Sequence, residues 1–540
     1  MQNNTRRALV FVIATFIVAN LHAEESSVDL LIQNARVVDG TGSPWFRSDV
    51  AISNGRIVDM GVDLRLDARE TIDAAGRVLA PGFIDVHTHV ESSDRRDGLQ
   101  RLPRADNYVL DGVTTIVTGN CGGSEIDIAA WNSSLSGLGI NVATLIGHNS
   151  VRRAVMGLDD RAPTPRELEQ MQALVEQAMQ DGAVGFSTGL LYVPGTYATT
   201  GEVISLAAVA SGYGGVYASH IREQGAKLHD SIDEAVRVGR EAGMPVQISH
   251  FKLKGRTRWG NIGEAIELVE YYRRQGVDVV IDAYPYDRAS SNLGITMPRW
   301  AVSGGAEEIA ARIQDDDTHS RIVGDMKAML DDGGYLDYSF ATVAQYRPEQ
   351  SYNGRTISDI NRLAERPATN DAEIETILEM MVEGGEAGST YGASMIYHYM
   401  HMDDVDTIYR YPNTAVASDG TIMAYGRGQP HPRSYGTNAR VLADFVRDRK
   451  ILTLEDAIRR MTSLPARTFS FHDRGIVRPG FIADLVLFDP SIVADQATFE
   501  DPHQYSVGFD YVLVNGVAVV ADGEMTDKRS GKFVKGPGAG

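Results

Sequence analysis

The sequence predicts an α/β fold in which a (β/α)8 barrel is joined to a small β-sandwich domain formed by both chain ends. Three observations support this prediction. The chain has 540 residues, enough for more than one structural unit. Strand-like segments bounded by Gly and Asn occur near both ends, in residues 24–80 and 466–540. Between them, in residues 81–465, apolar strand-like segments alternate with helical patterns, as in parallel βα units.

The central region contains eight candidate strands with helical stretches between several of them. Residues 165–181 show the helical pattern clearly, with Glu167 in the first turn and apolar residues at helical spacing. Eight strands with crossovers fit a (β/α)8 barrel, and a doubly wound open sheet is the alternative. The interval of about 287–413 exceeds a simple crossover, which predicts an inserted, lid-like helical segment. The strands are expected at residues 83–89, 114–120, 141–147, 183–188, 216–220, 245–250, 278–283 and 414–418.

The two chain ends are expected to pair in one small domain. Strand patterns occur at residues 29–38, 49–52 and 56–60, and again at 483–488 and 511–520. Asn515-Gly516 is typical of a tight turn between two strands. The last residues, 531–540, are rich in Gly and Lys, and we expect them to be disordered.

The overall charge excludes one class of partner. The formal net charge is −21, so the chain lacks the basic surplus that displaces counterions from nucleic acid. A small-molecule substrate remains compatible with this charge, because a single buried cation can bind an anion. The acidic balance therefore bears mainly on solubility.

Residues 1–23 are expected to be a cleaved signal peptide. Arg6 and Arg7 precede an apolar run over residues 8–21, and Ala23 offers a small residue for cleavage. The run is shorter than a membrane span, so we expect an exported protein, periplasmic or secreted, without stable membrane association after cleavage. Such proteins usually contain disulfides, yet this chain has a single cysteine, Cys121.

Potential metal ligands occur at the ends of several predicted barrel strands. A His-x-His pair lies at the end of the first strand, and two alternate residues on a strand point to the same side. In a barrel, the C-terminal strand ends form the reactive face. Imidazole and thiolate ligands suit zinc, and an incomplete ligand set leaves a position for water. The expected metal ligands are His87, His89, Cys121, His220 and His250.

Each of these residues also has a structural explanation when taken alone. A single His at a strand end is more often a hydrogen-bonded core residue, and a lone Cys is often a small buried hydrophobe. Asp419, after the last predicted strand, could cap the next helix. As the carboxylate at that strand end, it is the expected general base for a metal-activated water. For Asp85, a structural role is expected.

The motifs at these strand ends resemble the amidohydrolase superfamily, and more narrowly the N-acyl-D-amino-acid deacylases (D-aminoacylases). The broader resemblance rests on PGFIDVHTH at 81–89 and GIVRPGFIADLVLFD at 475–489. The narrower one rests on GNCG at 119–122, GFSTGL at 185–190, YASHIR at 217–222, SHFK at 249–252, DAYPY at 282–286, SDG at 418–420, HPR at 431–433 and YGT at 435–437. It covers nearly the whole chain after the signal segment.

The resemblance implies specific roles. Cys121, His220 and His250 would form a tight zinc site, and His87 with His89 a weaker second one. The fourth strand offers no lysine of the kind that many relatives carboxylate as a ligand, which disfavours a hydantoinase or dihydroorotase type. The residues implied to contact substrate are Lys252 and Tyr284, which would hold the α-carboxylate, Tyr192 and Ser290 in the pocket, and His431 with Arg433, which would close the site. Arg222 would contact substrate or pair with a carboxylate such as Glu223.

The resemblance therefore implies a zinc-dependent hydrolase of N-acyl-D-amino acids or of dipeptides with a C-terminal D-residue. One alternative is a hydrolase of cyclic amides or imides, and a second is a non-catalytic metal-binding scaffold protein. The side-chain preference stays open: an acidic substrate would need a cation such as Arg288 or Arg355 in the pocket. Gln224 departs from the family pattern, in which an acidic residue is expected.

Overall fold

A computed structural model describes residues 27–91, 97–389 and 391–539. The predicted signal peptide, residues 1–23, lies outside these ranges. Within them, no helix is both long and apolar enough to span a bilayer.

The centre of the molecule is a closed ring of parallel strands. One sheet has the order β6-β8-β9, a second β10-β11-β12-β13-β14-β18, and β19 pairs with β7. Because β6/β7, β9/β10 and β18/β19 are consecutive pieces of chain, the three sheets join into an eight-stranded barrel, as predicted. The strands are β6 (Phe83–Asp85), β7 (Thr88–His89), β8 (Val113–Thr118), β9 (Asn141–Thr144), β10 (Ile146–Gly147), β11 (Gly185–Gly189), β12 (Val216–His220), β13 (Val246–Ile248), β14 (Val279–Ala283), β18 (Thr414–Val416) and β19 (Gly420–Thr421).

Helices surround this ring. The predicted helix at 165–181 is confirmed as α4 (Pro165–Asp181), which begins with a Thr164/Glu167 capping box and ends at Gly182 in the left-handed region. The other helices of the described chain around the barrel are α1 (Asp106–Val109), α2 (Ile128–Ser134), α3 (His148–Met156), α5 (Thr200–Gly212), α6 (Leu228–Ala242), α7 (Ile262–Arg274), α12 (Met402–Arg410), α13 (Arg433–Arg440), the π-helix Val441–Asp448, α14 (Leu454–Met461) and α15 (Ser463–Thr468).

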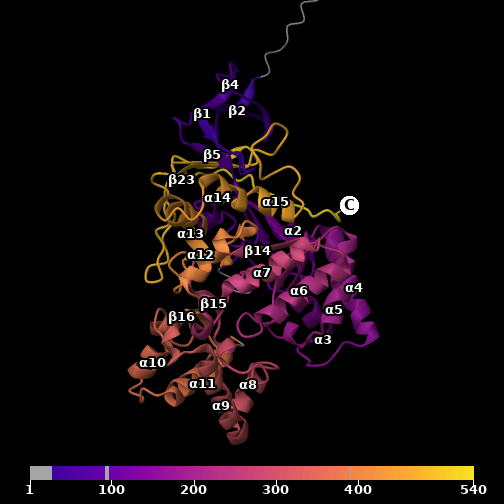
Figure 1. Ribbon diagram of the computed structural model, residues 1–540, viewed down its shortest axis with the longest axis vertical. Helices are drawn as coiled ribbons and strands as arrows, with labels where there is room; N and C mark the ends of the chain where they lie inside the picture. The colour runs from indigo at the N-terminus through magenta and orange to yellow at the C-terminus, as the bar shows by residue number, and fades with distance from the viewer. Residues whose placement is uncertain (1–26, 92–96, 390, 540) are drawn as a thin grey trace, which may run out of the picture.

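The inserted segment contains helices, as predicted, and also a small sheet that the sequence did not indicate. It contains an antiparallel sheet in the order β15-β17-β16, from β15 (Ala289–Asn292), β16 (Ala341–Gln345) and β17 (Ser394–Tyr397). Its helices are α8 (Ala306–Gln314), α9 (Asp316–Gly333), α10 (Ile357–Leu363) and α11 (Asn370–Glu386). It has its own hydrophobic core and projects from the end of the barrel opposite the β-domain (Figure 1).

Both chain ends contribute to one β-sandwich domain, whose early and late strands lie side by side in Figure 1. Its sheet runs β23-β22-β21-β20-β5-β1-β2-β3, with β4 beside β1, and the antiparallel β20–β5 pair joins the two ends. Asn515 and Gly516 form the turn between β21 and β22, both with positive φ. The strands are β1 (Val28–Val37), β2 (Phe46–Ser53), β3 (Arg56–Gly61), β4 (Ala68–Asp73), β5 (Val78–Pro81), β20 (Leu485–Phe488), β21 (Phe509–Val514), β22 (Val517–Ala521) and β23 (Glu524–Met525).

The prediction of a disordered C-terminal tail is wrong for residues 531–539. The backbone of Lys532 and Val534 exchanges hydrogen bonds with Val142 on β9, at 2.9 and 2.7 Å. At Gly531 a Cβ would lie 2.1 Å from the Ile140 carbonyl oxygen, and at Gly536 it would lie 2.2 Å from that of Ala183. The glycines therefore allow close backbone packing against the barrel, whereas their number alone resembles a flexible linker.

A buried ion pair links α3 to α5. Glu202 is 5% exposed and Arg152 fully buried, and both Glu202 oxygens lie 2.9 Å from Arg152 Nη1. The Nε2 atom of His148 lies 2.9 Å from Glu202 Oε1. We expect Glu202→Gln to lower the free energy of unfolding by about 3–5 kcal/mol, because Arg152 would remain buried without its counter-charge. Urea denaturation measures this, with Glu267→Gln on exposed α7 surface as the matched control, expected within about 0.5 kcal/mol of wild type.

The same ion pair predicts a pH dependence. Burial raises the pKa of Glu202, but His148 and Arg152 outweigh it, so the pKa lies below its ordinary value. A lowered folded-state pKa gives stability that is present above the unfolded pKa and lost as pH falls through the folded pKa. The difference in free energy of unfolding between wild type and Glu202→Gln should therefore have its full size at about pH 6 and shrink below about pH 4. An unchanged difference over this range would contradict the assignment.

Candidate metal centre and active site

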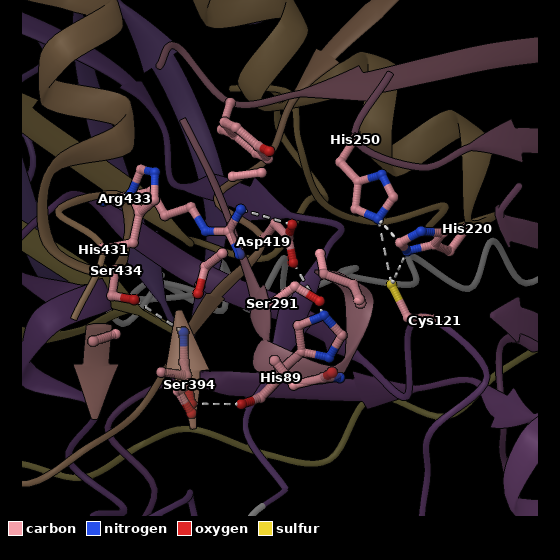
Figure 2. Close-up of a pocket in the computed structure, with 18 of the residues that line it drawn as sticks. His89, Cys121, His220, His250, Ser291, Ser394, Asp419, His431, Arg433 and Ser434 are labelled. Carbon is pink, nitrogen blue, oxygen red and sulfur yellow. Dashed lines mark hydrogen bonds and ion pairs between the residues drawn. The ribbon is translucent and has the colours of Figure 1, made fainter. Parts of the chain in front are cut away.

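The expected ligands gather at the C-terminal ends of the barrel strands. His87 and His89 come from the β6/β7 segment, Cys121 follows β8, His220 ends β12 and His250 follows β13. Figure 2 shows the side chains of Cys121, His220 and His250 pointing toward one another, with His89 nearby. Three overlapping groups of potential ligand atoms each lie within 4.8 Å of one another: His87/His89/Cys121, Cys121/His220/His250 and His87/His250/Asp419.

The Cys121, His220 and His250 side chains have spacings that fit a tetrahedral metal. The Sγ atom of Cys121 is 3.5 Å from both His220 Nδ1 and His250 Nε2, and these nitrogens are 2.8 Å apart. Around zinc, with Zn–N about 2.0–2.1 Å and Zn–S about 2.3 Å, such separations are about 3.6 Å for S–N and about 3.3 Å for N–N. The two S–N distances agree, and the N–N distance is about 0.5 Å shorter. The donor set and its shape therefore fit a zinc-like ion.

The electrostatics of this group favour a thiolate. Burial raises the pKa of the Cys121 thiol, but neighbouring His87, His250 and His220 lower it well below its ordinary value. The thiolate is the form of cysteine that binds metals. The backbone also holds this side chain in place, since Cys121 has φ of 52°, a conformation uncommon for a non-glycine residue.

The His-x-His pair lies beside this group, toward Asp419. The Nε2 atom of His87 is 3.4 Å from Cys121 Sγ and 3.6 Å from Asp419 Oδ1, and His89 Nε2 is 3.1 Å from the same oxygen. His89 is the more accessible imidazole, with a side chain 36% exposed, whereas His87 is fully buried. The pair can thus contribute to a second metal position adjoining the first.

Asp419 connects the metal ligands to a buried arginine. Its Oδ2 atom is 2.8 Å from Arg433 Nη1, and both side chains are less than a tenth exposed. Burial raises the pKa of Asp419, but Arg433, His87 and His89 outweigh it, so the pKa lies well below its ordinary value. Asp419 is therefore held as an anion, and it does not cap a helix, because strand β19 (Gly420–Thr421) follows it directly.

Three residues support the ligand imidazoles and Asp419, and one of them, Asp282, was given no role from the sequence. Asp282, at the end of β14, lies 3.3 Å from His87 Nδ1 and accepts the His250 backbone N–H at 2.7 Å. Such carboxylates orient imidazole ligands. Gln224, the departure from the family pattern, places its amide 3.1 Å from His250 Nδ1. Asp85 accepts backbone N–H groups of His87 and Ser418, in keeping with its expected structural role. The position of Asp282 at a strand end was the signal available in the sequence.

Comparisons with known proteins identify the family. The profile described as amidohydrolase family matches residues 70–520. The chain belongs to the amidohydrolase family. Among curated relatives, D-aminoacylase of Alcaligenes xylosoxydans xylosoxydans is 32% identical over 95% of this chain and 98% of its own length. The N-acyl-D-glutamate deacylase of the same organism is 33% identical over 92% of this chain and 94% of its own.

Solved structures agree with this family assignment. A D-aminoacylase structure described as having a binuclear metal centre superposes with a TM-score of 0.78, at 31% identity over 94% of this chain and 100% of that chain. An N-acyl-D-glutamate deacylase from Bordetella bronchiseptica, complexed with zinc and a phosphonate mimic of the tetrahedral intermediate, gives 0.76 at 32% identity, with the same coverage. A D-hydantoinase at 17% identity and a TM-score of 0.54 shares the fold.

The amidohydrolase active site opens into a cavity of about 440 Å³. Five of the residues predicted to contact the substrate line this cavity: Lys252, Tyr284, Tyr192, Ser290 and His431. Lys252 is 4% exposed, and its Nζ lies 5.4 Å from the Tyr284 ring centroid, while Arg433 Cζ lies 4.6 Å from that centroid. The buried Tyr284 hydroxyl has no hydrogen-bond partner among the described residues. Lys252, Arg433 and the Tyr284 hydroxyl thus form a cationic wall of the cavity, in which the hydroxyl is free to bind a substrate oxygen.

Three arginines lie elsewhere than expected. Arg222 does not line this cavity and forms an ion pair with Glu234 at 2.9 Å, instead of with Glu223. Arg288 and Arg355, the cations considered for an acidic side chain, line a different cavity beside Gln429 and Phe499. Within the described residues, the cations lining the central cavity besides Arg433 are Lys252 and Lys254.

Proposed function

We propose that the protein hydrolyses the amide bond of N-acyl-D-amino acids with the help of bound zinc. The observation that carries the proposal is a complete set of reacting groups in one cavity. The Cys/His ligand group, an ionised Asp419 beside it and the buried amine of Lys252 all line this cavity. The named activities of the curated relatives, D-aminoacylase and deacylases of N-acyl-D-glutamate and N-acyl-D-aspartate, support this substrate class.

We assign the tight zinc site to Cys121, His220 and His250, and a weaker second site to His87 and His89. One thiolate and two imidazoles suit zinc and leave a coordination position open. When bound, the metal supplies Lewis acidity, which lowers the pKa of a water ligand and polarises the amide carbonyl. The two structures named above, one with a binuclear centre and one with zinc, support this assignment.

Asp419 moves the proton. Its Oδ1 faces the ligand imidazoles, so it can accept the proton of the attacking water as the C–O bond forms. The same carboxyl then donates that proton to the amide nitrogen, and the C–N bond breaks with release of a neutral amine. Arg433, 2.8 Å from Oδ2, keeps the carboxyl anionic until the water proton arrives and orients its other oxygen toward the reaction.

Lys252 and Tyr284 hold the α-carboxylate of the substrate. Burial lowers the pKa of Lys252 to about 7, and a bound carboxylate restores the protonated form by its opposite charge. With the carboxylate fixed at this wall and the amide nitrogen facing Asp419, two of the four substituents of the α-carbon have fixed positions. One configuration then directs its side chain into open space, which selects a single enantiomer.

The alternative is hydrolysis of cyclic amides or imides. Hydantoinases share the barrel, but at 16–17% identity this likeness concerns the fold alone. The strand β11 of this chain, Gly185–Gly189, carries no lysine for carboxylation. A linear substrate with a free α-carboxylate also uses the buried Lys252, whereas a hydantoin has no such group.

A substrate panel separates the two activities. Zinc-loaded protein is incubated with N-acetyl derivatives of apolar and acidic D-amino acids, and with a hydantoin and a dihydroorotate. The expected result is amine release from the linear substrates and no conversion of the cyclic substrates to their ring-opened N-carbamoyl acids, which chromatography measures. Ring opening without linear turnover would favour the alternative, and no turnover of either class by folded, zinc-loaded protein would leave the scaffold hypothesis.

We also propose export, supported by the Arg6-Arg7 pair and the apolar run that follows. Fractionation of cells expressing the full chain should recover mature protein that begins near Glu24 outside the cytoplasm.

A further inference from the structure

A second cavity adjoins the active site. Its volume is about 310 Å³, and it shares five lining residues with the central cavity: Leu191, Tyr192, Lys254, Asn292 and Ile295. Beyond this junction its walls are largely apolar, and they include Val193, Met297, Val302, Met329 and Tyr391. None of the roles assigned above uses this space, although it lies against the reaction centre.

The position of the junction indicates which part of a substrate would enter it. The leaving nitrogen must face Asp419, and the α-carboxylate faces Lys252 and Tyr284. The junction lies on the side of the zinc ligands, because the Tyr192 ring contacts the His220 ring at a centroid distance of 4.7 Å. With the nitrogen on the Asp419 side, the remaining substituent of the scissile carbonyl, the acyl group, points toward Tyr192.

The charged groups at the junction disfavour an acyl group that carries an ammonium. In a dipeptide with a free N-terminus, an ammonium lies one carbon away from the scissile carbonyl. Lys254 is a cation at this place, and no described residue forms an ion pair or hydrogen bond with its ammonium group. Glu223 also lines the second cavity, but its two oxygens accept the backbone N–H groups of Gly225 and Lys227 at 2.7 and 2.6 Å. A substrate ammonium would therefore meet the charge of Lys254, while the Glu223 oxygens already accept backbone N–H groups and are less available to it.

We propose that the second cavity binds the acyl group, and that the substrates carry an extended apolar acyl chain instead of a free N-terminal amino group. The volume of this cavity is roughly ten times the about 30 Å³ that one water molecule occupies in the liquid, so the cavity has room for a chain of several carbons. This inference rests on the proposed function and deepens it: the class is N-acyl-D-amino acids with medium-length fatty acyl groups.

The experiment compares three acyl groups on one D-amino acid, the one hydrolysed fastest in the N-acetyl panel. Octanoyl should exceed propionyl by about 10-fold or more in kcat/KM, because each methylene that enters the cavity loses contact with water. Glycyl matches propionyl in size but has an ammonium in place of a methyl group, and it should be at least about 10-fold poorer than propionyl.

A cavity-filling variant tests the location. Val302 lines the second cavity and not the central one, so Val302→Trp should lower kcat/KM for octanoyl by about 10-fold more than for propionyl. Leu336→Trp is the matched control, since Leu336 is 84% exposed on the same inserted segment.

Three results would overturn the proposal: equal kcat/KM for octanoyl and propionyl, glycyl turnover as fast as propionyl, or an equal effect of Val302→Trp on both acyl lengths. Failure of the proposed function looks different, because then no N-acyl-D-amino acid, acetyl included, is hydrolysed, and the acyl proposal falls with it.

Discussion

Replacing Asp419 by Asn should lower kcat by about 10²–10⁴-fold while the metal content stays at the wild-type level. The amide is nearly isosteric with the carboxyl but cannot accept the proton of the attacking water or return it to the amine. The Cys121, His220 and His250 ligands are untouched by this change, so the tight metal remains. Amine release and metal analysis on the same protein sample measure the two quantities.

The control is Asp403→Asn, at a carboxylate whose side chain is 82% exposed on α12. It should match wild type in both measurements. If Asp419→Asn kept more than a tenth of the wild-type kcat, another group would have to carry the proton. If it lost the tight metal, Asp419 would be a ligand and not the base.

The second large effect is expected for Cys121→Ser. Loss of a partner that only orients a ligand costs about 10–100-fold in metal affinity, so loss of a ligand should cost more than about 100-fold. Turnover should fall with metal occupancy, because the serine hydroxyl is not ionised near neutral pH. Titration with zinc, followed by amine release, measures both effects.

His89→Asn provides the comparison within the same site. Its imidazole is the more exposed one and lies beside Asp419, on the weaker metal position. This variant should retain the tight metal, so its zinc affinity should fall much less than that of Cys121→Ser. Equal zinc loss in both variants would contradict the assignment of separate tight and weak positions. A thiol-reactive probe gives an independent readout, since bound zinc should protect the single cysteine of wild type.

The barrel and the residues at its strand ends could be predicted from the sequence because both follow local rules. Alternation of apolar strands with amphipathic helices is a short-range pattern, and α4 was predicted to the residue because its capping signals are local. The His-x-His pair, Cys121, His220, His250 and Asp419 stood out because chemistry-bearing residues recur at strand ends. The structure brings these six side chains together.

What the sequence did not predict depends on contacts between distant segments. The Arg433–Asp419 pair joins the start of α13 to the end of the last strand, and no spacing rule links them. Strands β15, β16 and β17 are short and pair across more than fifty residues, so the insertion looked helical. The C-terminal tail resembles a flexible linker in composition because it is rich in glycine. These glycines allow close packing on the barrel, and this need follows only from the barrel surface.

In the proposed function, the cationic wall at Lys252 and the metal ligands together select D-configured N-acyl-amino acids. The most direct measurement is kcat/KM of the zinc-loaded wild-type protein for the N-acetyl-D and N-acetyl-L forms of the same amino acid. We expect a preference of about 100-fold or more for the D form, since misplacing the amide by about 1 Å costs that much. Equal kcat/KM for the two enantiomers, or a preference for the L form, would contradict the selection of the D form by this site.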